Sequence, residues 1–143
     1  MAMVGIRSRL GGTDMISLRM LLGVTTGLVL AAGVALAQMG EPAKMAQTDK
    51  GPALVDAKGM TLYTFDKDAG GKSACNGKCA ENWPPLMAAA DAHAMGKWSV
   101  IARDDGSKQW AYNGKPLYTW IKDAKPGDTT GDAVNKVWWV AKP

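Results

Sequence analysis

One short stretch of this chain occurs twice, and the repetition limits the possible folds more than any other feature of the sequence. Residues 62–68 read LYTFDKD and residues 117–123 read LYTWIKD. When residues 51–83 are aligned without gaps at an offset of 55 residues, nine of the 33 positions are identical, where average composition would give about two. We therefore expect two copies of one small unit, which share a core because neither copy could bury its own aromatic residues.

The local sequence of each copy predicts strands and tight turns. Asn113-Gly114, between two runs of apolar and aromatic residues, is typical of a β-hairpin because both turn positions require positive φ. Only residues 87–95 (MAAADAHAM) have helix-forming composition. The predicted strands are residues 53–56, 60–65, 97–103, 108–112, 116–121 and 137–141.

Large aromatic rings, rather than branched aliphatic side chains, are expected to form the core. All six Trp, all three Tyr and the single Phe lie between Tyr63 and Trp139. The predicted fold is therefore all-β: a small single domain of two duplicated β-hairpin units that share an aromatic core, after a cleaved signal peptide. The domain is expected at residues 51–143, with repeat one at about 51–86 and repeat two at about 106–141.

The first 37 residues have the features of a cleaved signal peptide. Three arginines precede an uncharged apolar run, residues 20–37, which ends in the small-x-small cleavage site Ala35-Leu36-Ala37. The run is short and leads directly into polar residues, so the mature chain is not expected to span a membrane. Gln38 stands where a lipobox would have its cysteine, so no lipid anchor is expected, and residues 38–50 are predicted to be a flexible tether. The predicted location is periplasmic or secreted.

The charge of the exported part does not indicate a nucleic-acid partner. The whole chain has 17 Lys and Arg against 13 Asp and Glu; removing the three arginines and one aspartate of the leader leaves 14 against 12, a net charge of +2. So small an excess, with no basic stripe, does not predict binding to nucleic acid. The sequence identifies no other partner.

The repeated motif has two interpretations. Alternation along a strand places Tyr63 and Phe65 on one face, and Asp68 follows the strand end, where a carboxylate accepts N–H groups of the next loop. In this interpretation the motif is scaffold. In the other, the aspartates and tyrosine hydroxyls form two symmetric ligand contacts. The motif residues are Tyr63, Phe65, Asp68, Tyr118, Trp120 and Asp123.

Two cysteines, Cys75 and Cys79, flank an Asn-Gly turn that brings them together. Because an exported chain meets an oxidising compartment, the default prediction is a structural disulfide. Closing so small a loop stabilises a fold by about 2 kcal/mol in the chain-entropy treatment.

Two functional alternatives remain open for these residues. Reduced Cys75 and Cys79, with His93 and Met95, would form a soft site suited to Cu(I). Thiol–disulfide exchange is the other, although the C-x-x-x-C spacing differs from the C-x-x-C of thioredoxin-type sites. Apart from copper, no cofactor is expected.

The sequence does not predict an enzyme. The chain has one histidine, no nucleophile-elbow sequence and no phosphate-binding glycine loop, so a hydrolase triad or a nucleotide site has little support. The function predicted first is an exported, non-enzymatic binding or structural module. A periplasmic copper-binding protein comes second, and a thiol–disulfide redox protein third.

The combined motifs resemble one protein family. The pattern Y-x-aromatic-x-x-D occurs at residues 63–68 and 118–123, with C-x-G-x-C-A-x-x-W-P-P-L at residues 75–86 between them. This is similar to the secreted repeat family of predicted lipoproteins with a Yx(FWY)xxD motif, over residues 51–140. The resemblance implies an exported bacterial protein and implies no activity. The chain departs from the family in lacking the lipobox cysteine, so lipid anchoring is not carried over.

Overall fold

The structure, a computed structural model, describes residues 40–143, so the predicted signal peptide, residues 1–37, lies outside the described residues. The described part contains short strands, one α-helix and one 3-10 helix. In chain order these are β1 (Lys44–Thr48), β2 (Gly51–Val55), β3 (Tyr63–Phe65), α1 (Lys78–Asn82), β4 (Met87–Ala88), β5 (Trp98–Ala102), β6 (Lys108–Tyr112), β7 (Lys115–Pro116), η1 (Val134–Lys136) and β8 (Trp138–Val140).

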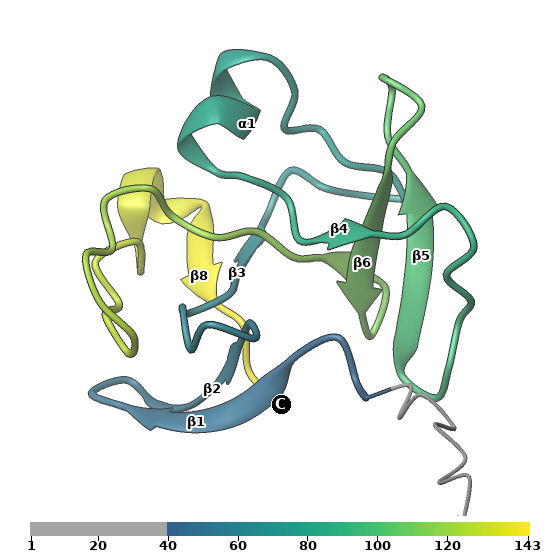
Figure 1. The fold of residues 1–143 in the computed structure, drawn as a ribbon. Coiled ribbons are helices and arrows are strands. Elements are labelled where there is room, and N and C mark those ends of the chain that lie inside the picture. Colours follow the sequence, from purple (N-terminus) through teal and green to yellow (C-terminus); the bar gives the residue numbers. More distant parts are fainter. Residues whose placement is uncertain (1–39) are drawn as a thin grey trace, which may run out of the picture. The chain divides into compact units, whose positions relative to one another are not determined.

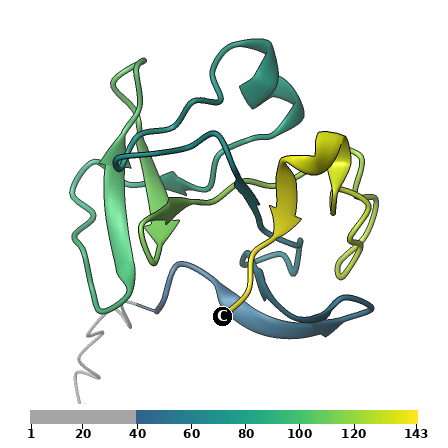
Figure 2. The ribbon, with the colours of Figure 1, turned by 180° about the vertical axis from the view of Figure 1, so that it is seen from behind.

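The strands form small antiparallel sheets (Figure 1). β1 pairs with β2, and β5 pairs with β6, which also pairs with β4 and β7. β3 pairs with β8, and Figure 2 shows the same two strands side by side from behind. The prediction of a small all-β domain is confirmed.

The hairpins β1–β2 and β5–β6 are the same unit built twice. Lys44 lies opposite Val55 in the first, and Ser99 lies opposite Ala111 in the second. The offset between the copies is therefore 55 residues along β1 and β5 and 56 along β2 and β6. The turn that follows β2 has one residue more than the turn that follows β6. This extra residue brings the offset between the copies back to 55 at the LYT segments. The predicted duplication is confirmed.

The two copies meet at their motif tyrosines. The backbone N–H of Tyr63 donates to the carbonyl of Tyr118 at 2.8 Å, and the N–H of Tyr118 donates to the carbonyl of Tyr63 at 3.0 Å. This reciprocal pair places the pseudo-twofold relation of the repeats between the two tyrosines. Both side chains are fully buried.

The first core cluster contains a row of stacked rings from both copies. Phe65 stacks on Trp138 with centroids 4.2 Å apart, Trp138 on Trp83 at 3.8 Å, and Trp83 on Trp120 at 3.9 Å. The rings come alternately from repeat one and repeat two. Neither repeat could form this stack alone, so the predicted shared aromatic core is confirmed.

The second core cluster lies on the other face of the motif strands. Leu62 and Leu117, each next to a motif tyrosine, are fully buried in it with Leu54 and Trp98. Tyr63 and Tyr118 belong to the first cluster. The alternation expected from a strand covered on both faces is therefore present.

The prediction of a flexible tether over residues 38–50 is wrong for Lys44–Thr48. These residues form β1, which pairs along its whole length with β2 from Lys44–Val55 to Thr48–Gly51. β1 is an edge strand with exposed and half-buried side chains, so it has none of the apolar alternation from which a strand is recognised. Backbone hydrogen bonds to β2 hold it in place.

Residues 87–95, the segment with helix-forming composition, form no helix in the structure. Met87 and Ala88 form β4 opposite Gln109 and Lys108, and the α-helix is instead α1, which contains Cys79. Helix propensity is a weak preference in so short a segment, and pairing with β6 overrides it.

Candidate functional site

Each motif tyrosine binds the motif aspartate of the other repeat. The hydroxyl of Tyr63 donates to Oδ2 of Asp123 at 2.6 Å, and the hydroxyl of Tyr118 donates to Oδ2 of Asp68 at 2.6 Å. The sequence places both residue types in one motif but does not show that they pair between motifs. The repeated motif is therefore an interlock between the copies.

The second carboxylate oxygen of each aspartate fastens the loop that follows it. Asp68 Oδ1 accepts the backbone N–H of Ala74 at 2.6 Å. Asp123 Oδ1 accepts the backbone N–H of Thr130 at 3.0 Å and its hydroxyl at 2.5 Å. These contacts are the ones that the scaffold interpretation expects, so both carboxylates join a partner repeat to a loop.

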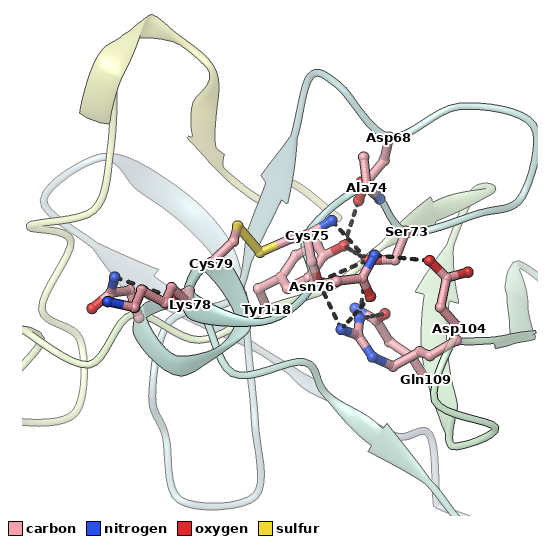
Figure 3. Close-up of a disulfide and its surroundings, with 12 residues drawn as sticks. Asp68, Ser73, Ala74, Cys75, Asn76, Lys78, Cys79, Asp104, Gln109 and Tyr118 are labelled. Atoms are coloured by element: carbon pink, nitrogen blue, oxygen red, sulfur yellow. Dashed lines mark hydrogen bonds between the residues drawn. A yellow bond between two sulfur atoms is a disulfide. The ribbon is translucent and has the colours of Figure 1, made fainter.

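A buried arginine, Arg103, supports the Tyr118–Asp68 pair. Figure 3 shows Ser73, Gln109 and Tyr118, which belong to this network, near the disulfide. Arg103 Nη1 donates to Ser73 Oγ at 2.9 Å and to Gln109 Oε1 at 2.8 Å. Its Nη2 donates to the carbonyl of Cys75 at 2.7 Å and to Asn76 Oδ1 at 3.2 Å. The guanidinium therefore holds the cysteine loop against β6.

The hydrogen bonds run in one direction from the arginine to the aspartate. Tyr118 has one hydroxyl proton, which it donates to Asp68, so Ser73 Oγ, 2.6 Å away, donates to the tyrosine oxygen. Ser73 in turn accepts from Arg103. Burial raises the pKa of Asp68 above its ordinary 3.8, opposed by the hydrogen bonds from Tyr118 and Ala74 and by the charge of Arg103.

Both motif tyrosines remain protonated at neutral pH. Burial raises the pKa of each hydroxyl well above 10, and the hydrogen bond donated to a carboxylate raises it further. A buried tyrosine that keeps its proton and donates it in a hydrogen bond to a carboxylate stabilises the fold. It is not suited to act as a base that removes a proton from a substrate.

The Tyr63–Asp123 pair has no such arginine. Gly131 donates its backbone N–H to the hydroxyl of Tyr63 at 3.2 Å. By the strand register, Thr48 is the counterpart of Arg103 and Ala53 is the counterpart of Gln109. Ala53 is fully buried, so side-chain packing takes the place of the polar network.

The cysteines are joined to each other in the structure. Cys75 and Cys79 form a disulfide, and the described residues contain no free cysteine. Cys75 is fully buried in the first core cluster, whereas Met95 packs against the second and His93 is exposed. Within residues 40–143 no group of three or more His, Cys, Asp and Glu could hold a metal ion. The structure thus does not assemble the copper site predicted from Cys75, Cys79, His93 and Met95.

Met95 instead lines a cavity of about 560 Å³, which we call the Trp98 cavity. Glu41, Lys44 and Lys97 contribute the charged groups of its lining. The ammonium of Lys97 lies 5.9 Å from the ring centre of Tyr112. The apolar wall consists of Ala43, Met45, Leu54, Met95, Trp98 and Tyr112.

Residues of unequal size occupy equivalent positions of the two hairpins in the second core cluster, beside this cavity. Trp98 is the counterpart of Ala43, and Trp110 is the counterpart of Leu54, by the register of the two hairpins. Repeat one therefore supplies smaller side chains than repeat two at this end of the second cluster. The smaller side chains, Ala43 and Leu54, line the cavity together with the large ring of Trp98.

Sequence reasoning missed Arg103 and the cavity. One signal could have indicated the arginine: Arg103 is the only arginine after residue 37, where every other basic residue is a lysine. A planar group with five donors is needed where several fixed acceptors meet, and lysine cannot replace it. No signal in the sequence indicates the cavity, because it depends on how the two hairpins pack.

Comparison with models of protein families identifies a family for this chain. A family described as "Secreted repeat of unknown function" matches residues 44–87 and 99–142, one segment for each copy of the unit. No curated protein and no solved structure matches the chain. Between residues 40 and 143, no helix has the length and apolar character to cross a membrane.

Proposed function

The chain belongs to the secreted repeat family, and we propose that this member is a non-enzymatic binding module that takes its ligand in the Trp98 cavity. Export is a property of the family. Binding, the lack of catalysis and the position of the site are the proposal.

The state of the motif residues supports a module without catalysis. Both tyrosine hydroxyls are buried and donate to carboxylates, and both carboxylates also accept loop N–H groups. A general acid or base needs a group that can exchange a proton with a substrate within hydrogen-bond reach. Here the hydrogen-bonding capacity of these groups is used within the fold.

The chemistry of the Trp98 cavity supports ligand binding. Small-molecule sites in proteins are concave, mostly apolar, and carry a few polar groups that fix orientation. The volume of about 560 Å³ lies within the range usual for such sites, roughly 300–1,000 Å³. Aromatic and thioether side chains form the wall, and one carboxylate and two ammonium groups belong to the lining.

The observation that carries the proposal is the asymmetry of a duplicated core. At the stack of Phe65, Trp83, Trp120 and Trp138, each repeat provides a ring to match the other. At the Trp98 cavity, Ala43 of repeat one is the counterpart of Trp98 of repeat two, so the two repeats do not supply matching rings. The result is an apolar recess at the surface, walled by Trp98 and the exposed thioether of Met45, and such a recess is suited to a ligand.

The proposal is tested with 8-anilinonaphthalene-1-sulfonate, an apolar dye that becomes fluorescent out of water. We expect saturable binding of one dye molecule per chain by the folded protein. Met45→Glu should weaken dye binding by about tenfold or more, because it places a carboxylate beside the apolar wall and the anionic dye. Met45 is 69% exposed, so the fold should tolerate the change.

Met87→Glu is the matched control, because Met87 is also an exposed methionine (53%) on a strand, β4, and does not line the cavity. It should leave dye affinity within about twofold of wild type. A folded protein that binds no dye, or an equal loss of affinity in both variants, would overturn the proposed function.

A further inference from the structure

We propose that a second site, beside Trp120, binds an acidic saccharide: one sugar ring stacks on the indole face, and its carboxylate pairs with the ammonium of Lys122. The site is a cavity of about 650 Å³, which we call the Trp120 pocket. Its lining residues are Trp120, Lys122, Thr130, Val134 and Asn135. It shares no lining residue with the Trp98 cavity, so the inference goes beyond the proposed function.

Trp120 is the last ring of the stacked row in the first core cluster. One of its faces is covered by Trp83, whose ring centre lies 3.9 Å from its own. The ammonium of Lys122 lies 5.5 Å from the centre of the Trp120 ring. Because Trp83 already fills one face, this ammonium marks the other face. Trp120 is only half-buried, and its free face is part of the pocket wall.

A ring face with a polar rim suits a sugar. A pyranose ring presents C–H groups on one side, and the negative face of an indole attracts such positively polarised hydrogens. The hydroxyls around the sugar ring need polar partners when they leave water. In the Trp120 pocket an amide, a hydroxyl and an ammonium supply these partners, from Asn135, Thr130 and Lys122.

Thr130 is held in place with an acceptor available. Its backbone N–H and its hydroxyl both donate to Oδ1 of Asp123, at 3.0 and 2.5 Å. A hydroxyl that donates its one proton keeps lone pairs, so Oγ1 of Thr130 accepts from a sugar hydroxyl. Asn135 is exposed, and its amide offers both a donor and an acceptor. The rim therefore matches hydroxyl groups in both hydrogen-bonding roles.

The charge of the lining favours an acidic sugar over a neutral one. Among the described residues that line the pocket, Lys122 has a charged side chain and none has a carboxylate. A hydrogen bond between an ammonium and a carboxylate is stronger than one between neutral groups. Lys122 is exposed and its side chain is flexible, so a sugar that covers the indole moves the ammonium aside to its own carboxylate.

Repeat one holds its disulfide at the equivalent positions. At the offset of 55 residues, Thr130 and Val134 are the counterparts of Cys75 and Cys79. Cys75 is fully buried and bonded to Cys79, whereas Thr130 is exposed. The copy without the disulfide therefore has a polar rim beside the row of rings.

The backbone of this rim differs from its counterpart as well. Cys79 belongs to the helix α1, whereas Val134 begins η1, in which Asn135 and Lys136 have φ of +51° and +57°. Ala133, just before η1, has φ of +61°. Left-handed conformations of residues other than glycine cost free energy and cluster at functional segments such as ligand clamps. The strain supports a role for this segment beyond closing a loop.

The test uses the full exported protein and trimers of galacturonate, mannuronate and glucuronate, which differ in the C–H groups that share one face. Calorimetry measures affinity, and tryptophan fluorescence reports contact with Trp120. We expect at least one of the three trimers to bind, with one molecule per chain and a change in fluorescence. Its methyl ester, which carries no charge, should bind about threefold more weakly or less tightly still. Lys122→Met should weaken binding of the acid by a similar factor and leave binding of the ester unchanged.

Two variants have matched controls. Lys67→Met changes the counterpart of Lys122 in repeat one, an exposed lysine outside the pocket, and should bind the acid like wild type. Asn135→Gly removes the rim amide at a position where glycine tolerates the positive φ, and should weaken binding by about threefold or more. Asn113→Gly makes the same change at another exposed asparagine of positive φ, outside the pocket, and should bind like wild type.

Trp120→Phe tests the ring itself. It places in repeat two the ring that repeat one has at Phe65, so the fold should tolerate it. The variant should bind the acid more weakly and lose the change in fluorescence.

The inference is overturned if none of the three trimers binds, if the ester binds as tightly as the acid, or if either control loses as much affinity as its partner. It is also overturned if Met45→Glu weakens sugar binding as strongly as Lys122→Met, because the sugar would then lie in the Trp98 cavity. A protein that binds the dye and no uronate trimer loses this site and keeps the proposed function.

Discussion

The two tyrosine–aspartate pairs have the same inner geometry and different support. In both, a buried hydroxyl donates to a carboxylate at 2.6 Å, and the carboxylate also accepts a loop N–H. The Tyr118–Asp68 pair is supported by the hydrogen bonds of Arg103 and by the disulfide loop. The Tyr63–Asp123 pair is supported by the backbone N–H of Gly131, which packs closely against the rings of Tyr63 and Trp83.

The tyrosine–aspartate interlock is therefore the same in the two copies, and the residues that surround it are not. A buried tyrosine hydroxyl has one proton to donate and can still accept a hydrogen bond. The acceptor side is filled by Ser73 in one copy and by the N–H of Gly131 in the other. Either solution satisfies the polar groups, so each loop was free to diverge.

The largest effect is expected from removing the arginine. Arg103→Leu removes the guanidinium hydrogen bonds to Ser73, Gln109 and the carbonyl of Cys75, and should lower the free energy of unfolding by about 3–5 kcal/mol. Thr48→Val, at the counterpart position in repeat one, should cost about 1 kcal/mol or less. Urea denaturation of both variants checks the comparison, and equal losses would contradict it.

The next largest effect is expected at the glycine that supports the other pair. A Cβ on Gly131 would lie 2.8 Å from Cζ of Tyr63 and 2.9 Å from Cη2 of Trp83. Because both rings are held in the core, Gly131→Ala should destabilise the fold by about 3 kcal/mol. Gly70→Ala is a useful control, since a Cβ there meets nothing within 4 Å. Its loss should come only from the positive φ, at about 1 kcal/mol.

Gly131→Ala also separates the two supports. Its hydrogen bond to Tyr63 comes from the backbone, so the substitution acts through packing alone. Thermal unfolding measured with and without reductant should show that the loss in Gly131→Ala is independent of the disulfide. A loss that grows on reduction would show that the two loops are energetically coupled.

Removal of the disulfide should have a smaller effect. The double variant Cys75→Ser and Cys79→Ser should lose about 2 kcal/mol, since the closed loop is short and the arginine still holds the carbonyl of residue 75. In wild type, an alkylating reagent should label no thiol before reduction and two afterwards, with a lower melting temperature. Labelling of the unreduced, folded protein would contradict a structural disulfide.

The smallest expected effect is a pH dependence at Asp68. Its folded-state pKa is raised by burial above the ordinary 3.8, so the folded protein holds this proton more tightly than the unfolded chain. The contribution of Asp68 to stability is therefore present below pH 3.8 and is lost as pH rises through the folded-state pKa. Asp68→Asn lacks this change, so its destabilisation relative to wild type should become smaller from pH 3 to pH 7. Urea denaturation across that range checks this, and a destabilisation that grows with pH would contradict the raised pKa.

The sequence predicted the parts of the fold that depend on neighbouring residues. Asn113-Gly114 marked the turn between β6 and β7, and the two cysteines around Asn76-Gly77 marked the disulfide. The local conformational preference of the residues did not predict the segments that form strands by pairing with another strand. Met87–Ala88 became a strand because β6 offered a partner, and Lys44–Thr48 became a strand because β2 did.

From the sequence alone it follows that the fold is built from two copies of one unit and that the core is aromatic; that each motif aspartate fastens the following loop was one of two interpretations. These properties follow from short-range spacing and composition, which one copy already contains. The packing of the repeats was needed to show that each tyrosine binds the aspartate of the other copy, that Arg103 supports one pair, and that Ala43 and Trp98 line one cavity. The tyrosine and aspartate of each pair lie 50 or 60 residues apart, so they meet only when the repeats pack, and packing depends on all side chains at once.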